Sequence, residues 1–503
     1  MKTGCLILLL CVHATAAEFF VSTNGTPAND GSYSSPWSLS FALTNSASVS
    51  AGDTIWLRGG TYIPTNNILT GTNFPSGSPA WAVSLTGAAG QHITFRSYTN
   101  EWAKLDRPLR LYSSDYLQFR DLEFYDSLKG VDPGNPSYPN PTPWPHIDDD
   151  RASSHNEWVN CLVHDANSGW NGGTAGQSIR GCIIWNIGEN ELHHVTYPSP
   201  DEFSGNVIGW GTADALNLND GRSTFTMRSN IVFGMGQTIS GLTVGTAART
   251  TTNSVIAFNS IYSRFSTDKI DTAIKVSGGS QYVLSNNFIA SSGGIISFIG
   301  TVTNAIVSGN TFHMSSPFAS YAMLSRTATN GSWSFGNNRY TAQPNTLVRF
   351  EDPGASLTFS QWQALGFDSD SSSTNSTLPV NSVQVYRNFD EHKRAHIAVF
   401  NWTTNHNATV DVSGVLNNGD GYRLYSAQNY GGGPIKTGTV NGGSISVPLT
   451  NLAAAPLLYV DTNFWSMSEA PVTSPEFAAF VIKGFAAGSA TANSATVGRI
   501  SVR

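Results

Sequence analysis

Charged side chains are scarce in this chain. They make up 12% of its 503 residues, whereas roughly 25% is usual for a globular domain. The 27 basic and 34 acidic residues leave a net charge of −7, and no basic stripe is available to neutralise a phosphate backbone. The composition argues against nucleic acid as a partner and predicts that hydroxyl and amide side chains keep the surface hydrated.

Cysteine is also scarce, with four in the whole chain. Cys5 and Cys11 lie in an N-terminal segment with a basic start, a short apolar run and small residues, which is typical of a secretory signal. The run is shorter than the roughly 20 residues that span a bilayer. We therefore predict that residues 1–17 are a signal peptide, that the protein is extracellular or periplasmic, and that it has no transmembrane segment. The mature chain keeps only Cys161 and Cys182, which excludes a disulfide scaffold.

An internal repeat is the main positive signal. A small or amide residue followed by apolar residues recurs at Cys161, Cys182, Asn206, Asn230, Ser260, Asn287 and Asn310. The irregular steps and the lack of a helical period suit coils of three short parallel strands with turns of variable length. Asparagine at one turn position can then form a ladder of stacked amides along the solenoid.

The two remaining cysteines occupy the same position in successive coils. Their Cα atoms should therefore lie about 4.8 Å apart, one strand spacing, which a disulfide tolerates. The sequence leaves open whether Cys161 and Cys182 form a bridge or stack as buried thiols.

The N-terminal segment carries a family resemblance. The stretch EFFVSTNGTPANDGSYSSPWSLSFAL, followed by GDTIWLRGGTY, resembles the opening coils of secreted right-handed parallel β-helix proteins of the pectate lyase-like superfamily. With the repeat, the resemblance covers roughly residues 19–345. It implies a right-handed β-helix and activity on a polysaccharide. It does not choose a reaction, because that superfamily includes lyases, hydrolases and esterases.

The repeat ends before the chain does. We predict an all-β protein with a β-helix over residues 18–365, a Ser/Thr/Asp-rich linker over 366–381, a C-terminal β-sandwich over 382–482 and a flexible tail over 483–503. The sandwich either covers the solenoid or binds carbohydrate. We expect a monomer.

Candidate site residues come from aligning, coil by coil, the strands that follow the second turn. The aligned segments are NELHHVT, DALNLND, GLTVGT and AIKVSG. If Leu192, Leu216, Leu242 and Ile274 point inward, alternation places outward the residues His193, Asn217, Thr243 and Lys275. His194 is then expected in the core. The same face gathers Glu191, Asp214, Asn219, Asp220 and Lys269.

Two reactions fit these residue types. β-Elimination of a uronic acid polymer needs a base, His193 or Lys275, and a cation that holds the charge developing on the substrate carboxylate. Lys269 supplies that cation, or calcium held by carboxylates such as Asp214, Asp220 and Asp271. Hydrolysis instead needs two carboxyls, for which the pairs are Glu191 with Asp214 or Asp214 with Asp220.

A Pro-rich insertion lies between Phe124 and Cys161. Its composition predicts a loop rather than a strand, and its run of acidic residues is expected to be a solvated turn. Tryptophans near this insertion are candidates for stacking on sugar rings, namely Trp144, Trp158 and Trp170.

The leading hypothesis is thus a polysaccharide lyase or glycoside hydrolase that cleaves an acidic extracellular glycan in a groove along the β-helix. A non-catalytic carbohydrate-binding or adhesion protein is the alternative, since the same fold would serve it. A purely structural solenoid leaves the ionisable residues on one face unexplained.

Overall fold

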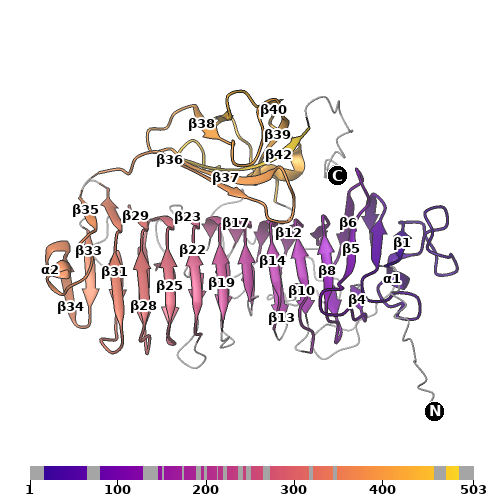
Figure 1. Cartoon of the computed structure of the whole chain (residues 1–503), viewed down its shortest axis with the longest axis horizontal. Coiled ribbons are helices and arrows are strands. Elements are labelled where there is room, and N and C mark those ends of the chain that lie inside the picture. The colour runs from indigo at the N-terminus through magenta and orange to yellow at the C-terminus, as the bar shows by residue number, and fades with distance from the viewer. Residues whose placement is uncertain are drawn as a thin grey trace, which may run out of the picture.

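The computed structural model describes most of the chain. The described residues are 16–64, 80–127, 145–149, 152–172, 175–188, 194–197, 201–211, 213–218, 224–235, 242–244, 251–263, 272–315, 321–343, 348–375, 377–457 and 472–486. They form a long solenoid with a smaller β-domain lying along one side of it (Figure 1).

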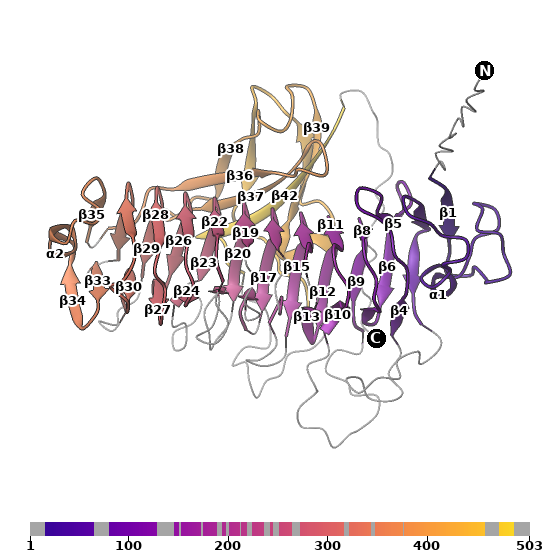
Figure 2. The ribbon, with the colours of Figure 1, turned by 60° about the horizontal axis from the view of Figure 1, so that its bottom comes forward.

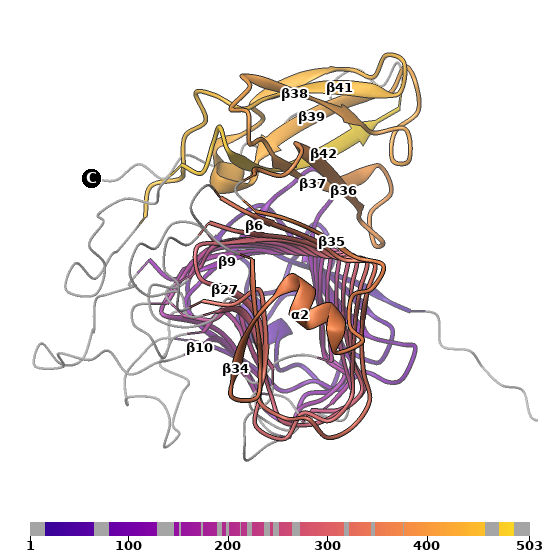
Figure 3. The same cartoon turned by 90° about the vertical axis from the view of Figure 1, so that its left-hand side faces the viewer.

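The solenoid is a right-handed parallel β-helix with three faces, which Figure 3 shows end-on. The first face is sheet 1, a parallel sheet of twelve strands. Its strands are, in order, β1 (Glu18–Val21), β2 (Thr54–Leu57), β5 (Ile93–Ser97), β8 (Leu117–Arg120), β11 (Glu157–Val159), β14 (Ser178–Arg180), β16 (Glu202–Ser204), β19 (Phe225–Arg228), β22 (Ser254–Ala257), β25 (Tyr282–Ser285), β28 (Ala305–Ser308) and β31 (Trp333–Gly336).

The second face, sheet 2, also has twelve parallel strands and lies under the C-terminal domain (Figure 3). They are β3 (Gly60–Tyr62), β6 (Ala103–Asp106), β9 (Glu123–Tyr125), β12 (Leu162–Ala166), β15 (Ile183–Ile187), β17 (Val207–Gly211), β20 (Ile231–Met235), β23 (Ser260–Ser263), β26 (Phe288–Ser291), β29 (Thr311–Met314), β32 (Arg339–Ala342) and β35 (Ser372–Thr374).

The third face, sheet 3, comes in two parts that follow one another along the solenoid (Figure 2). The first part has β4 (Trp81–Val83), β7 (Leu109–Leu111), β10 (Pro145–Asp149) and β13 (Ser168–Gly172). The second part has β18 (Leu216–Leu218), β21 (Leu242–Val244), β24 (Thr272–Ser277), β27 (Gly294–Ile299), β30 (Leu324–Arg326), β33 (Arg349–Asp352) and β34 (Ala355–Thr358), of which only the β33–β34 pair is antiparallel.

Alternation along the short strands builds the core. β-Branched, aliphatic and aromatic side chains at every second position point inward and stack on their copies in the neighbouring coils. The rings of Phe95, Phe119 and Trp158 form one such stack, with centroids 5.4 and 6.0 Å apart. The continuous core explains why a chain of this length needs no disulfide.

The predicted asparagine ladder is present inside the wall. The side-chain amide of Asn206 donates to Oδ1 of Asn230 at 3.1 Å, and the series continues through Asn259, Asn287, Asn310 and Asn338 at 2.9 to 3.0 Å. Placing Ser260 in this series was wrong by one residue. Ser260 begins β23 and pairs with Ile231, so that Asn259 occupies the ladder position.

Both cysteines of the solenoid are buried and free. Cys161 and Cys182 lie in successive coils, as expected, and each thiol contacts backbone carbonyl oxygens, such as Phe119 O at 3.4 Å from Cys161 Sγ. Burial raises the pKa of the Cys161 thiol, which is the behaviour of a packing residue and not of a nucleophile.

Short helices lie at both ends of the solenoid. Helix α1 (Leu39–Ala42) packs near the first coil, and α2 (Phe359–Ala364) crosses the last one (Figure 3). A capping box between Thr358 and Gln361 starts α2. Trp362 packs its ring on Phe350 and so closes the core. The last solenoid strand is β35, which pairs with β32 and therefore extends the solenoid beyond the boundary predicted at residue 365.

The Pro-rich insertion contains a strand that the sequence did not predict. Residues Pro145–Asp149 form β10, which pairs with β7 and β13. Proline is tolerated because it occupies the first position of the strand. Asp148 pairs with Arg110 at 3.3 Å, and Asn156 donates to Asp149 at 3.2 Å, so that these carboxylates are structural rather than a solvated turn.

The C-terminal domain is a β-sandwich, as predicted. Five antiparallel strands form one sheet in the order β36 (Ser382–Arg387), β37 (Arg394–Phe400), β42 (Phe477–Phe485), β39 (Gly421–Ser426) and β40 (Lys436–Thr439). The second sheet has β38 (Asn407–Asp411) and β41 (Ser444–Pro448), and a 3₁₀ helix η1 (Ala427–Gly432) follows β39. The central position of β42 shows that residues beyond the predicted end at 482 belong to this domain.

The sandwich packs on sheet 2 through an apolar cluster. Aromatic side chains from both domains meet there, with the Tyr262 and Phe477 rings stacked at 4.6 Å and the Phe288 and Phe400 rings at 4.1 Å. An interface with such a buried aromatic centre holds the two domains in one arrangement.

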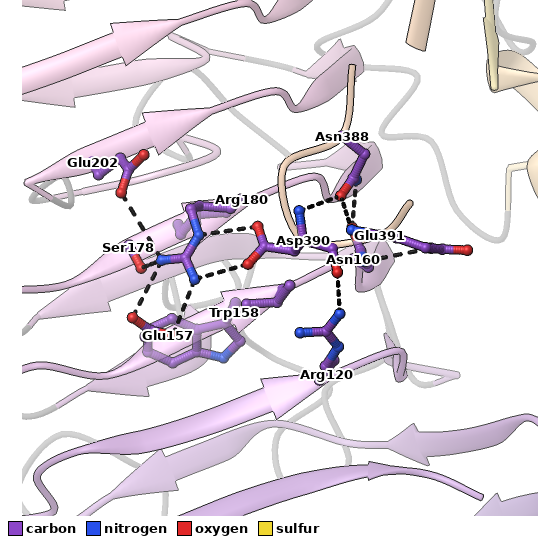
Figure 4. A network of polar contacts seen from close by, with 12 residues as sticks. Arg120, Glu157, Trp158, Asn160, Ser178, Arg180, Glu202, Asn388, Asp390 and Glu391 are labelled. Carbon is purple, nitrogen blue, oxygen red and sulfur yellow. Dashed lines mark hydrogen bonds and ion pairs between the residues drawn. The ribbon is translucent and has the colours of Figure 1, made fainter. Parts of the chain in front are cut away.

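A polar network fixes the edge of this interface (Figure 4). The Arg180 guanidinium lies between Asp390 of the sandwich and Glu157 of the solenoid, at 3.1 Å from each carboxylate. The Asn388 amide donates to Asn160 Oδ1 at 2.6 Å. The loop between β36 and β37 is therefore anchored on the turns between sheets 1 and 2.

Candidate functional site

Sheet 3 carries a column of polar side chains on its outer face. Leu216, Leu242 and Ile274 point into the core, as predicted. The next residues along the strands pair with one another in register and are half-buried, and they form the polar column: Asn217, Thr243, Lys275, Ser297 and Ser325. The column runs across successive coils and suits an extended polymer.

The segment before β18 has a different register from the predicted one. The backbone N–H of Asn217 donates to Thr196 O at 3.1 Å, and the backbone N–H of Val195 donates to Asp214 O at 3.0 Å. These bonds place Thr196, instead of Leu192, next to Leu216. His194 consequently stands beside Asp214, and Tyr197 beside Asn217.

Asp214 is a fully buried carboxyl at the edge of the polar column. Burial raises its pKa to about 7, and the Thr243 hydroxyl, the Lys275 charge and the Asn217 side chain oppose that rise. The Asn217 amide donates to Asp214 Oδ2 at 3.1 Å, while Oδ1 has no hydrogen-bond partner among the described residues. The carboxyl is therefore held near the midpoint of its titration at neutral pH.

His194 belongs to the same cluster and is buried, as predicted. Its Nδ1 is 3.7 Å from Asp214 Oδ2, and its Nε2 accepts from the Asn217 amide at 3.2 Å. Burial lowers the pKa of His194 to about 4, so the ring is neutral at physiological pH. Its single proton then resides on Nδ1, facing the Asp214 carboxyl.

Tyr197 is the residue of this face that sequence reasoning missed. Its ring stacks on His194 with centroids 5.6 Å apart, and 37% of the residue is exposed. An exposed aromatic ring next to a column of amides and hydroxyls is a platform for a sugar ring. The aromatic signal was visible in the sequence, but only the corrected register puts it on this face.

Lys275 is the cation of the polar column. It is half-buried in the middle of β24, and within the described part of the chain its ammonium group makes no hydrogen bond or ion pair. Asp214 is close enough to feel its charge. A cation in a partly desolvated position lowers the stability of the fold unless a counter-ion is close by. A bound ligand can supply that counter-ion.

The tryptophan predictions are wrong where they can be examined. Trp170 is 4% exposed and packs edge-on against Trp158 inside the core, so neither ring can present a face to a sugar. The alternation of side chains along β13 is the reason. Trp170 pairs with Ile147, whose side chain points into the core, so the Trp170 side chain also points inward. Trp144 lies outside the described residues.

Several predicted site residues also fall outside the described part of the chain, namely Glu191, His193, Asn219, Asp220 and Lys269. Their roles stay predictions. Of the carboxylates suggested for calcium, Asp214 is described, whereas Asp220 and Asp271 are not. Among the described residues, no group of three or more His, Cys, Asp or Glu side chains is arranged to hold a metal ion.

A second ionisable cluster lies on sheet 2. His164 contacts Asp165 at 2.6 Å and Glu123 at 3.2 Å, and Glu123 also pairs with Lys104 at 3.1 Å. These carboxylates raise the pKa of His164 to about 9 despite its burial. Every charge in this cluster is thus paired with another charge of the cluster.

The raised pKa of Asp214 makes a prediction about stability. The unfolded chain ionises this carboxyl near pH 3.8 and the folded chain near pH 7. The folded state therefore binds the extra proton in this window, and its free energy of unfolding falls as the pH rises, by roughly 4 kcal/mol at most. Asp214→Asn removes that loss. Urea unfolding measured below pH 3.8 and above pH 7 should therefore show that the free energy of unfolding of the variant increases relative to that of the wild type as the pH rises. Parallel pH profiles of the two proteins would contradict the burial of an ionisable Asp214.

Known proteins resemble this chain in structure but not in sequence. No protein-family model and no curated protein matches it. Similar solved structures include a lacto-N-biosidase from Eubacterium ramulus, with 15% identity over 64% of this chain and 67% of the other and a TM-score of 0.43. A mannuronic acid specific lyase of polysaccharide family 6 from human gut microbiota has 14% identity over 72% and 91%, with a TM-score of 0.42. Pectate lyase Pel9A has 18% identity over 59% and 80%, with a TM-score of 0.37.

These likenesses concern the fold. The chain itself forms a right-handed parallel β-helix, as predicted. At this level of similarity nothing about the reaction follows from them. In addition, none of the helices in the described residues has the length and apolar character needed to cross a membrane.

Proposed function

We propose that this protein is a secreted enzyme that cleaves an acidic extracellular polysaccharide bound along the outer face of sheet 3. The ammonium group of Lys275 carries this proposal, because it makes no hydrogen bond or ion pair with a described residue and a uronate carboxylate can supply that direct partner. A neutral glycan would leave that charge without a partner.

The neighbours of Lys275 suit a sugar polymer. Thr243 stands beside it in the polar column and Asn217 one strand further along, and they offer a hydroxyl and an amide for sugar hydroxyl groups. Tyr197 extends the same face with an exposed ring. Adjacent coils are about 4.8 Å apart, so successive residues of the column can contact successive sugar units of an extended chain.

β-Elimination is the reaction that this arrangement favours. A base removes the proton beside the uronate carboxylate, the electron pair forms a carbon–carbon double bond, and the bond to the leaving sugar oxygen breaks as that oxygen takes a proton. Lys275 stabilises the negative charge that develops on the carboxylate. His193 remains the predicted base. Asp214 and His194 are positioning residues, because both hold the side-chain amide of Asn217, which lies in the same polar column as Lys275.

Hydrolysis is a second candidate because of Asp214. A carboxyl whose pKa is raised to about 7 by burial resembles the general acid of a glycosidase. Its partner would be Glu191 or Asp220. Asp214 is however 0% exposed and lies behind the side chain of Asn217, to which it is hydrogen-bonded, which is why elimination is favoured.

An activity assay separates the two reactions. Polygalacturonate, alginate and hyaluronan are incubated with the wild type, and ultraviolet absorbance of the unsaturated uronate is followed together with new reducing ends. Both signals should rise on one acidic polymer. Reducing ends without absorbance would replace elimination by hydrolysis, and neither signal on any polymer, with binding retained, would favour a carbohydrate-binding or adhesion protein.

A further inference from the structure

The C-terminal domain has a cavity of its own. It has a volume of about 460 Å³ and is lined by the loop that joins β36 to β37, together with Val415. Three aspects of this loop, namely its anchoring, its exposed ring and its charges, show which of its side chains are available to a ligand.

One side of the loop is occupied by the solenoid. Asp390 pairs with Arg180, and Asn388 donates to Asn160, as Figure 4 shows. Glu391 accepts from Arg394 at 2.9 Å and stays within the interface. The acidic side chains of the loop are thus engaged in ion pairs and hydrogen bonds that hold the loop in place.

The loop also carries an exposed aromatic side chain, Phe389. Phe389 is 78% exposed, the highest value among the large apolar residues that the structure describes. Burying this ring on the protein would be favourable, yet the fold leaves it in solvent beside a cavity. Such a ring is available to stack on a sugar.

An arginine and a histidine line the same cavity as this ring. Arg387 and His392 are exposed, line the cavity and form no ion pair with a described residue. Lys393 also lines it, but its ammonium group is held by Asp420 at 2.7 Å. The buried Arg394 adds positive charge at the base of the loop, and its Nε has no hydrogen-bond partner among the described residues.

We propose that the β36–β37 loop carries a second binding site, which takes an acidic oligosaccharide. Phe389 stacks on a sugar ring, and Arg387 and His392 pair with its carboxylate or sulfate groups. This second site rests on the proposed function in one respect only, namely that the glycan is acidic. It lies on the domain that covers sheet 2, whereas Lys275 lies on sheet 3, so that one polymer can be held by the sandwich while another part of it occupies the polar column.

The test is affinity electrophoresis of the full chain in native gels that contain polygalacturonate, alginate or hyaluronan, with dextran as the neutral polymer. All proteins carry Lys275→Met so that the polymer is not degraded. At least one acidic polymer should retard this chain, and dextran should not. Adding Phe389→Ala or Arg387→Ala should weaken the apparent affinity at least about tenfold, as expected for loss of one stacking or charged contact.

Matched controls keep the test specific. Phe258→Ala removes another exposed phenylalanine, and Arg228→Ala another exposed arginine without an ion pair to a described residue, both from the solenoid. Neither should change the retardation, and unchanged thermal unfolding of all variants shows that they fold. Equal affinity of Phe389→Ala, Arg387→Ala and their parent, equal retardation by dextran, or no retardation by any acidic polymer would overturn the second site.

The two proposals fail separately. If Phe389 and Arg387 have no effect while the wild type cleaves an acidic polymer, the second site is wrong and the proposed function stands. If both residues are needed for retardation while the wild type cleaves no polymer, the second site stands and the enzyme proposal is wrong.

Discussion

Replacing Lys275 by methionine is expected to lower the rate of polysaccharide cleavage by about a hundred- to a thousand-fold, the usual cost of removing one group that stabilises developing charge. Methionine keeps the length and apolar stem of lysine but has no charge. Because the ammonium group has no partner among the described residues, its removal should not destabilise the fold. The initial rate under saturating substrate and the midpoint of thermal unfolding measure the two effects.

Two further substitutions define the role of the charge. Lys275→Arg should retain part of the activity, because it keeps the positive charge while changing its shape. Lys436→Met removes a lysine from β40 in the sandwich, where its ammonium donates to Ser446 O, and should leave the rate unchanged. Full activity of Lys275→Met would remove Lys275 from the site.

Asn259→Ala should be among the most destabilising single substitutions in the solenoid. The Asn259 amide donates to Met227 O at 3.1 Å and to Asn287 Oδ1 at 2.9 Å, and its oxygen accepts from the backbone and side-chain nitrogens of Asn230 at 3.0 and 2.9 Å. Alanine leaves these buried groups unsatisfied and opens a small cavity. We expect a loss of about 3–5 kcal/mol in the free energy of unfolding, measured by urea denaturation.

Asn330→Ala is the control for the ladder. Asn330 is exposed, and among the described residues its one hydrogen bond is made by its backbone oxygen, which accepts from the Trp333 ring nitrogen. Its substitution should change stability by no more than about 0.5 kcal/mol. If Asn259→Ala and Asn330→Ala had similar effects, the amide ladder would not be a principal source of stability.

The strands of regular coils could be predicted because their alternation is strong. Leu216, Leu242 and Ile274 are apolar residues at equivalent positions of successive coils, and a slip of one residue would expose all of them. This is why Asn217 and Lys275 were placed correctly on the outer face. The core contacts fix these positions.

The register of the preceding coil could not be read in the same way. The segment around His194 is too short and irregular to repeat the alternation, and its two histidines fit either face. Backbone hydrogen bonds to Thr196 and Val195 decide the register, and they depend on where the neighbouring coil lies. The partnership of Asp214 with His194 therefore appears only in three dimensions.

Two other differences have local causes. Asn259 and Ser260 are both common in turns, so the sequence could not tell which of them stacks on Asn230. The strand β10 begins with Pro145, and a composition rich in proline hides a strand in which proline occupies only the first position.

The central claim is that Lys275 serves the cleavage of an acidic polysaccharide on sheet 3. Mass spectrometry of the products formed from polygalacturonate, alginate and hyaluronan by the wild type and by Lys275→Met tests it most directly. The account predicts oligosaccharides with an unsaturated uronate at the new end from the wild type, and almost none from the variant. Identical products in similar amounts from both proteins, or products from neutral polysaccharides alone, would contradict it.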